Sequence, residues 1–138
     1  MRFREKYNFL SNFYPHEIVY DGEIYPTSEH AYQAAKFIDP DIKKKIRECN
    51  TPTHSKQMAR TFSENIDPDW NSKKLKVMYD ILHCKFNDPT LENKLLSIDV
   101  KIVEHNNWGD TFWGVCNGQG KNNLGKILER IKKEKEIF

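Results

Sequence analysis

The sequence predicts an α+β fold: a mainly helical single domain, residues 1–138, with a small and mostly antiparallel sheet. Three observations lead to this prediction. A length of 138 residues suits one compact core. Capping residues followed by apolar residues at helical spacing recur along the middle of the chain. Runs that favour β-structure are short and few, so the sheet is expected to be small.

Strands are expected in two places. Residues 17–20 and 23–25 flank Asp21-Gly22, a pair that favours a tight hairpin turn. Residues 100–104, Val-Lys-Ile-Val-Glu, are predicted to form one further strand. The aromatic segment 7–15 follows neither a helical nor a strand period and is predicted to be an ordered loop.

Helices are expected wherever a capping residue precedes an apolar pattern. Thr27 and Ser28 offer a hydroxyl cap, and three further helices follow Asp-Pro or Thr-Pro pairs, which are typical of helix starts. The predicted helices begin near Glu29, Pro40, Pro52, Trp70, Pro89 and Leu124.

Composition narrows the functional classes. There are 22 Lys and Arg residues against 20 Asp and Glu, and a net charge of +2 gives no strong field for a long polyanion. Cys49, Cys84 and Cys116 are widely spaced and supply neither a disulfide framework nor a CxxC pair. No apolar stretch approaches the ~20 residues of a membrane span. A soluble, cytoplasmic protein without a membrane partner is therefore expected.

Glu29 is the first candidate for chemistry, because it falls in the opening turn of a helix. Helical spacing places it on one face with Tyr32, Gln33 and Lys36. The helix dipole there favours the ionised carboxylate, whereas burial beside aromatic residues would raise its pKa, and the sequence leaves open which effect prevails. The alternative is an ordinary first-turn acid with Lys36 in solvent.

A second set of candidates lies in the segment 105–123, which is rich in Gly, Asn, Asp and Trp and lacks helical periodicity. Asp110 is either the second carboxylate of a hydrolase pair or the first residue of an Asx turn. Trp108 and Trp113 either stack on a flat ring of a ligand or fill the core. So long a connection is typical of a functional loop.

Metal and cofactor chemistry is not expected. The histidines, among them His30, His54 and His83, show no HExxH or similar ligand spacing. No GxSxG elbow or Cys-His pair indicates acyl transfer.

Assembled in order, these motifs resemble the NADAR family, also called YbiA-like. The matching segments span nearly the whole chain, and the combination of the second and fourth is specific: 9–15 (FLSNFYP), 25–30 (YPTSEH) continuing to Gln33 and Lys36-Phe37, Pro52 with Lys56 and Arg60, 110–114 (DTFWG) and 120–125 (GKNNLG).

The resemblance implies an N-glycosidase that splits a base or amine from C1 of a phosphorylated ribose, such as a phosphoribosylamino-pyrimidine of riboflavin biosynthesis. It implies catalytic roles for Glu29, Asp110, Lys36 and Trp113. The substrate contacts it implies are Asn12, Lys56, Arg60 and Asn123, to which Trp108 is added as a candidate stacking ring.

Two alternatives stay open from the sequence. One is an ADP-ribosyl hydrolase that removes ADP-ribose from guanine in nucleic acid or nucleotides. The other is a non-catalytic module that binds ADP-ribose or a nucleotide. The expected partner is thus a small phosphorylated ribosyl molecule, with ADP-ribosylated guanine as the alternative. The oligomeric state is not determined by the sequence.

Overall fold

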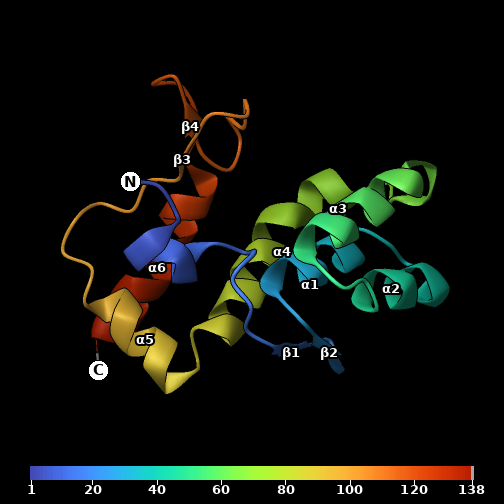
Figure 1. Cartoon of the computed structure of the whole chain (residues 1–138), viewed down its shortest axis with the longest axis horizontal. Helices are drawn as coiled ribbons and strands as arrows, with labels where there is room; N and C mark the ends of the chain where they lie inside the picture. Colours follow the sequence, from blue (N-terminus) through green and yellow to red (C-terminus); the bar gives the residue numbers. More distant parts are fainter. Residues whose placement is uncertain (138) are drawn as a thin grey trace. The chain divides into compact units, whose positions relative to one another are not determined.

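The computed structural model describes residues 1–137 as two compact units (Figure 1). The central unit is Asn12–Lys85, and the terminal unit combines Met1–Ser11 with the chain from Phe86 onward. The central unit contains strands β1 (Ile18–Tyr20) and β2 (Glu23–Tyr25), helices α1 (Ser28–Ala35), α2 (Pro40–Arg47), α3 (Pro52–Thr61) and α4 (Trp70–Lys85), and the 3₁₀ helix η2 (Ser63–Asn65). The terminal unit contains the 3₁₀ helix η1 (Glu5–Leu10), helices α5 (Pro89–Leu96) and α6 (Asn123–Glu136), and strands β3 (His105–Asn106) and β4 (Val115–Cys116).

Helix α1 lies at the middle of the central unit, where it contacts α2, α3, α4 and the β1–β2 hairpin (Figure 1). Ala31 and Ala34 have no exposed surface, and such small side chains allow neighbouring helices to approach closely. Residues 28–34 of α1 are all buried, including its polar residues. A helix that is buried on all sides must place its polar groups against other protein groups or in a binding site.

The helix starts agree with the prediction. Thr27, Asp39, Thr51 and Asp88 each accept a hydrogen bond from a backbone N–H of the first turn that follows them. Helices α2, α3 and α5 each begin with proline, whose missing N–H costs nothing at that position. Local sequence signals are therefore sufficient to determine where these helices begin.

The β1–β2 hairpin is also confirmed. The two strands pair antiparallel, with Ile18 opposite Tyr25 and Tyr20 opposite Glu23. Asp21 and Gly22 both have positive φ, at 51° and 79°. A two-residue turn of this kind requires positive φ at both positions, which Asp and Gly tolerate well.

Two expectations for segments that include residues of the terminal unit are wrong. The segment 7–15 is not entirely a loop, because η1 extends through Leu10. Phe9 and Leu10 at its end are buried, and the Phe9 ring meets the edge of Phe86 at a centroid distance of 6.4 Å. This packing holds a short helix that the aromatic pattern did not indicate.

The predicted strand at residues 100–104 is absent, and the pairing begins at His105 instead. The backbone of this segment bonds to side chains of α6 and its cap. Ile102 N–H donates to Glu129 Oε1 at 2.6 Å, Ile102 C=O accepts from Asn122 Nδ2 at 3.1 Å, and Glu104 N–H donates to Asn122 Oδ1 at 3.0 Å. Because these side chains satisfy the backbone groups, a neighbouring strand is not needed.

Strands β3 and β4 form a second small sheet of two parallel strands, so segment 105–123 is not entirely irregular. The predicted class, mainly helical with a small amount of β-structure, is confirmed. The expectation that residues 1–138 form one domain stays a prediction.

Lys85, at the end of α4, is 1% exposed, and its ammonium lies 5.6 Å from the centre of the Tyr14 ring. Burial lowers the pKa of Lys85 from its ordinary value of 10.5 to about 7. Because the unfolded chain binds this proton more tightly, the folded state gains stability as pH rises from about 7 to 10.5. Below that range the contribution of Lys85 is constant and unfavourable.

We therefore expect Lys85→Met to increase the free energy of unfolding most at neutral pH, with an advantage over the wild type that shrinks as pH rises toward 10.5. Chemical denaturation at a series of pH values measures the difference in free energy of unfolding between variant and wild type. The contributions of the other titrating groups are the same in both proteins and cancel in this difference. Lys76→Met, on the exposed side of the same helix, is the matched control. Parallel pH curves for Lys85→Met and the wild type would contradict the assignment.

Candidate functional site

The start of α1 is fixed by Asn12 and Thr27. Thr27 Oγ1 accepts from His30 N–H at 3.2 Å, and Asn12 C=O accepts from Glu29 N–H at 3.0 Å. The Asn12 side chain accepts from Ser28 Oγ at 2.8 Å. Asn12, predicted as a substrate contact, thus holds the first turn of the helix that carries Glu29.

Glu29 is 7% exposed, so it is not an ordinary first-turn acid in solvent. Gln33, one turn later, donates from Nε2 to Glu29 Oε2 at 2.6 Å. Burial raises the pKa of Glu29, while the Gln33 hydrogen bond and the charges of Lys56 and Lys36 act in the opposite direction. Burial therefore prevails, and the pKa of Glu29 lies above its ordinary value.

Lys36 is half-buried on the same helix face, with its ammonium 5.3 Å from the centre of the Tyr32 ring. Tyr32 in turn meets Trp70 edge to face, with centroids 5.3 Å apart. Burial lowers the pKa of Lys36; Glu29 opposes that effect, and the positive charges of Lys56, Arg60 and Lys74 reinforce it. The Lys36 ammonium is therefore more acidic than that of a lysine in water, which suits a group that donates a proton.

We call Glu29, Gln33, Lys36, Lys56 and Arg60 the α1 cluster. It joins the Glu29 carboxylate of α1 to Lys36, the residue that follows α1, and to two cations of α3, and these charged groups interact electrostatically. An excess of positive charge around one buried carboxylate suits a ligand that carries both an anionic group and a centre that becomes positive. Lys74 on α4 also acts on Lys36, and sequence reasoning missed it because its charge on an amphipathic helix looks like a solvated one.

The Asp110 turn is part of the terminal unit. Asp110 Oδ1 accepts from the N–H groups of Phe112 at 3.1 Å and Trp113 at 2.9 Å, which is the Asx turn considered from the sequence. Asn106 supports the turn, accepting from Asp110 N–H at 3.1 Å and donating to Asp110 C=O at 2.9 Å. At least one oxygen of Asp110 therefore has a structural role.

The position of Trp113 is fixed by backbone hydrogen bonds between its segment and residues 121–124. The C=O groups of residues 111–114 accept from the N–H groups of residues 121–124, including Trp113 C=O from Leu124 at 2.9 Å and Phe112 C=O from Asn123 at 3.2 Å. The Phe112 ring meets Trp113 edge to face at 4.8 Å. Trp108, by contrast, is 65% exposed, so it is not core material.

The predicted site residues therefore divide between the units. Asn12, Glu29, Lys36, Lys56 and Arg60 belong to the central unit, and Trp108, Asp110, Trp113 and Asn123 belong to the terminal unit.

Sequence reasoning gave no role to several buried polar residues. Asn106 bonds both Asp110 and Glu104, and Asn122, in the left-handed conformation, bonds the backbone of residues 102 and 104. Asparagine in a loop carries no signal that separates it from an ordinary turn residue. Gln33 did have a signal, namely its place one turn after Glu29 on the same face.

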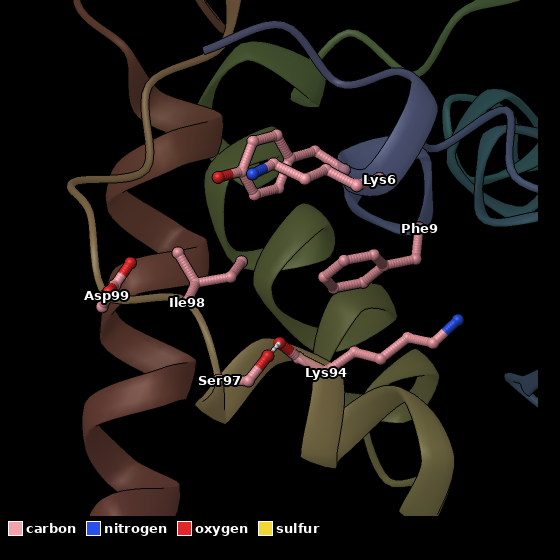
Figure 2. Close-up of a pocket in the computed structure, with 7 residues that line it drawn as sticks. Lys6, Phe9, Lys94, Ser97, Ile98 and Asp99 are labelled. Carbon is pink, nitrogen blue, oxygen red and sulfur yellow. Dashed lines mark hydrogen bonds between the residues drawn. The ribbon is translucent and has the colours of Figure 1, made fainter.

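The terminal unit contains a cavity of about 310 Å³ that none of the predicted site residues lines. Figure 2 shows the side chains that line it. The Lys94 ammonium lies 5.8 Å from the centre of the Phe9 ring, and Lys6 lies 5.0 Å from the centre of the Tyr7 ring. Ser97 Oγ donates to Lys94 C=O. Lysines stacked on aromatic rings in this way cover apolar surface, and we assign this cavity no role in the chemistry.

Within residues 1–137, His, Cys, Asp and Glu side chains form no group of three or more that could hold a metal ion. None of the helices in the described part of the chain has the length and apolar character needed to cross a membrane.

Comparison with known proteins identifies the family. The family model described as the NADAR domain matches residues 2–135, which include nearly all of both units. The chain belongs to the NADAR family. The resemblance inferred from the sequence motifs is thereby confirmed.

Relatives of this NADAR protein carry names that describe an activity. The chain is 36% identical over 136 residues to the N-glycosidase YbiA of Shigella flexneri, which covers 96% of this chain and 84% of that protein. It is 35% identical to a riboflavin biosynthesis protein of Vibrio vulnificus over 94% of this chain and 36% of that protein. The NMR structure of Escherichia coli YbiA is similar at a TM-score of 0.87 and 35% identity, covering 99% of this chain and 84% of that one.

Proposed function

We propose that this NADAR protein hydrolyses the N-glycosidic bond between a phosphoribosyl group and an amino-pyrimidine. The chain is an N-glycosidase, as its relatives' names indicate. The observation that carries the finer proposal is the burial of Glu29 within a cluster of cations. An anionic ligand with a reacting centre that becomes positive fits such a cluster.

The chemistry follows from the transition state of glycoside cleavage. As the bond between C1 and nitrogen breaks, its electron pair leaves with the nitrogen and C1 acquires oxocarbenium character. Ionised Glu29 stabilises that positive charge and accepts a proton from the attacking water. The departing nitrogen takes a proton from Lys36, and the products are the free ribose phosphate and the amine.

The cations support a phosphorylated substrate. Lys56 and Arg60 lie one helical turn apart on α3, a spacing that directs two cations to one side. Binding of a phosphate by these residues would orient the sugar through contacts remote from C1. The name of the riboflavin biosynthesis relative agrees with the amino-pyrimidine leaving group that the family resemblance implies. The catalytic roles expected of Asp110 and Trp113 stay predictions.

A comparison of two substrates tests the proposal. The protein is incubated with a phosphoribosylamino-pyrimidine and, in parallel, with ADP-ribosylated guanosine, and the released amino-pyrimidine or guanosine is measured by chromatography. We expect faster release from the phosphoribosylamine. Faster release of guanosine would instead identify the ADP-ribosyl hydrolase, and saturable binding of either compound without release would identify a binding module.

A further inference from the structure

Gln33 carries an unsatisfied polar atom beside Glu29. Its side chain is 3% exposed, and its Nε2 donates to Glu29 Oε2 at 2.6 Å. Its Oε1 is buried without a hydrogen-bond partner, the one side-chain atom for which this is found among residues 1–137. Buried polar atoms are nearly always paired, so an unpaired acceptor beside a candidate reactive group is a candidate contact for a bound substrate.

The orientation of the Gln33 amide follows from its neighbour. An ionised carboxylate has only acceptors, so the amide must turn its NH₂ group toward Glu29. The oxygen cannot exchange places with the nitrogen without setting two acceptors against each other. While Glu29 is charged, Oε1 therefore stays available as an acceptor. A ligand that contacts Oε1 must offer a hydrogen-bond donor.

We propose that Gln33 is a specificity-determining residue whose Oε1 accepts a hydrogen bond from the 2-hydroxyl group of the substrate's ribose. This inference rests on the proposed function, in which Glu29 faces C1 of the sugar. Residues one helical turn apart have Cβ atoms about 5–6 Å from each other, a separation that a ribose ring spans. The 2-hydroxyl is attached to the carbon next to C1, so it is the sugar donor nearest to the reacting bond.

Gln33 is also a positioning residue for Glu29. Its N–H holds the carboxylate by a hydrogen bond and lowers its pKa, as do the charges of Lys56 and Lys36. Removal of the amide leaves the two lysines in place and raises the pKa of Glu29 further. The site then needs a higher pH before its carboxylate is ionised.

The test compares Gln33→Met with the wild type on a phosphoribosylamino-pyrimidine and on its 2-deoxyribosyl analogue. The two compounds differ in intrinsic reactivity, so the informative quantity is the ratio of their kcat/KM values in each protein. We expect the kcat/KM of the ribosyl compound divided by that of the 2-deoxyribosyl compound to be ~10-fold or more lower in the variant, because only the ribosyl compound can use the lost acceptor. The acidic limb of the pH profile should also move to higher pH.

Gln57→Met, on the exposed side of α3, is the matched control and should change neither the ratio nor the pH profile. A purely structural Gln33, or one that binds only water, would lower both rates equally and leave the ratio unchanged, which overturns the inference.

A second measurement needs no variant. Calorimetric titration of the wild-type protein with ribose 5-phosphate and with 2-deoxyribose 5-phosphate should show ~10-fold weaker binding of the deoxy compound. Equal affinities would overturn the role of Gln33. Failure of the wild type to release base from any ribosyl substrate would overturn the proposed function instead, so the two failures are distinguishable.

Discussion

Replacement of Glu29 by Gln is expected to lower turnover of the phosphoribosyl substrate by ~100-fold or more, the range ascribed to a positioned acid or base. The change keeps the shape of the side chain and removes its charge. The neutral amide can neither stabilise an oxocarbenium ion nor accept the proton of the attacking water. Steady-state kinetics at saturating substrate measure the effect, and turnover at the wild-type rate would show that Glu29 is not the reacting carboxylate.

The same variant should be at least as stable as the wild type. Burial raises the pKa of Glu29 above its unfolded value of 4.5, so the folded state loses stability as pH rises through that pKa. A neutral Gln is free of this loss, and Gln33 can turn its oxygen to accept from the new amide. A melting temperature at neutral pH that is equal to or higher than that of the wild type separates a chemical role from a structural one.

Glu64→Gln is the control for both measurements. Glu64 is exposed in η2 of the same unit, so its replacement should leave turnover and melting temperature unchanged. The raised pKa of Glu29 gives a further expectation for the wild type: the acidic limb of its activity profile should lie above the usual range of a carboxyl group.

Gly114→Ala is expected to destabilise the terminal unit severely, at or above the upper end of the about 1–3 kcal/mol usual for overpacking. A Cβ atom at this position would lie 1.6 Å from Glu104 Oε2 and 2.4 Å from Glu104 C=O. The carboxylate can move aside, but the carbonyl oxygen belongs to the backbone and accepts from Val115 N–H at 2.8 Å. Relief of the clash therefore requires movement of the backbone that leads into β3 and β4.

Chemical denaturation compares Gly114→Ala with Gly118→Ala. Gly118 has φ of 77° and open space around its Cα, so alanine there costs only the strain of the left-handed conformation, about 1–2 kcal/mol. A Gly114→Ala protein no less stable than Gly118→Ala would contradict the close approach of Glu104.

Several features of the site were predictable because their signals are local. The placement of Glu29 in the first turn of a buried helix follows from Thr27 two residues earlier and from the small residues Ala31 and Ala34. The face shared by Glu29 and Lys36 follows from helical periodicity alone. Lys56 and Arg60 were found because their spacing within a Pro-capped helix matches the NADAR pattern.

Other features depend on groups far away in the sequence, and the sequence could not supply them. The absence of a strand at residues 100–104 results from Glu129 and Asn122, which take the hydrogen bonds that a neighbouring strand would otherwise make. The preference of Val100, Ile102 and Val103 for β-structure contributes less to stability than those hydrogen bonds do. Likewise, the exposure of Trp108 could not be separated from a core position by composition.

The sequence by itself determined the family, the helix starts and the hairpin, since capping residues and the Asp-Gly pair act over a few neighbouring residues. Only the tertiary structure decided that the pKa of Glu29 is raised and that the oxygen of Gln33 is unpaired. The physical reason is that a pKa and a missing hydrogen bond depend on everything packed around a group, and those surroundings come from several helices at once.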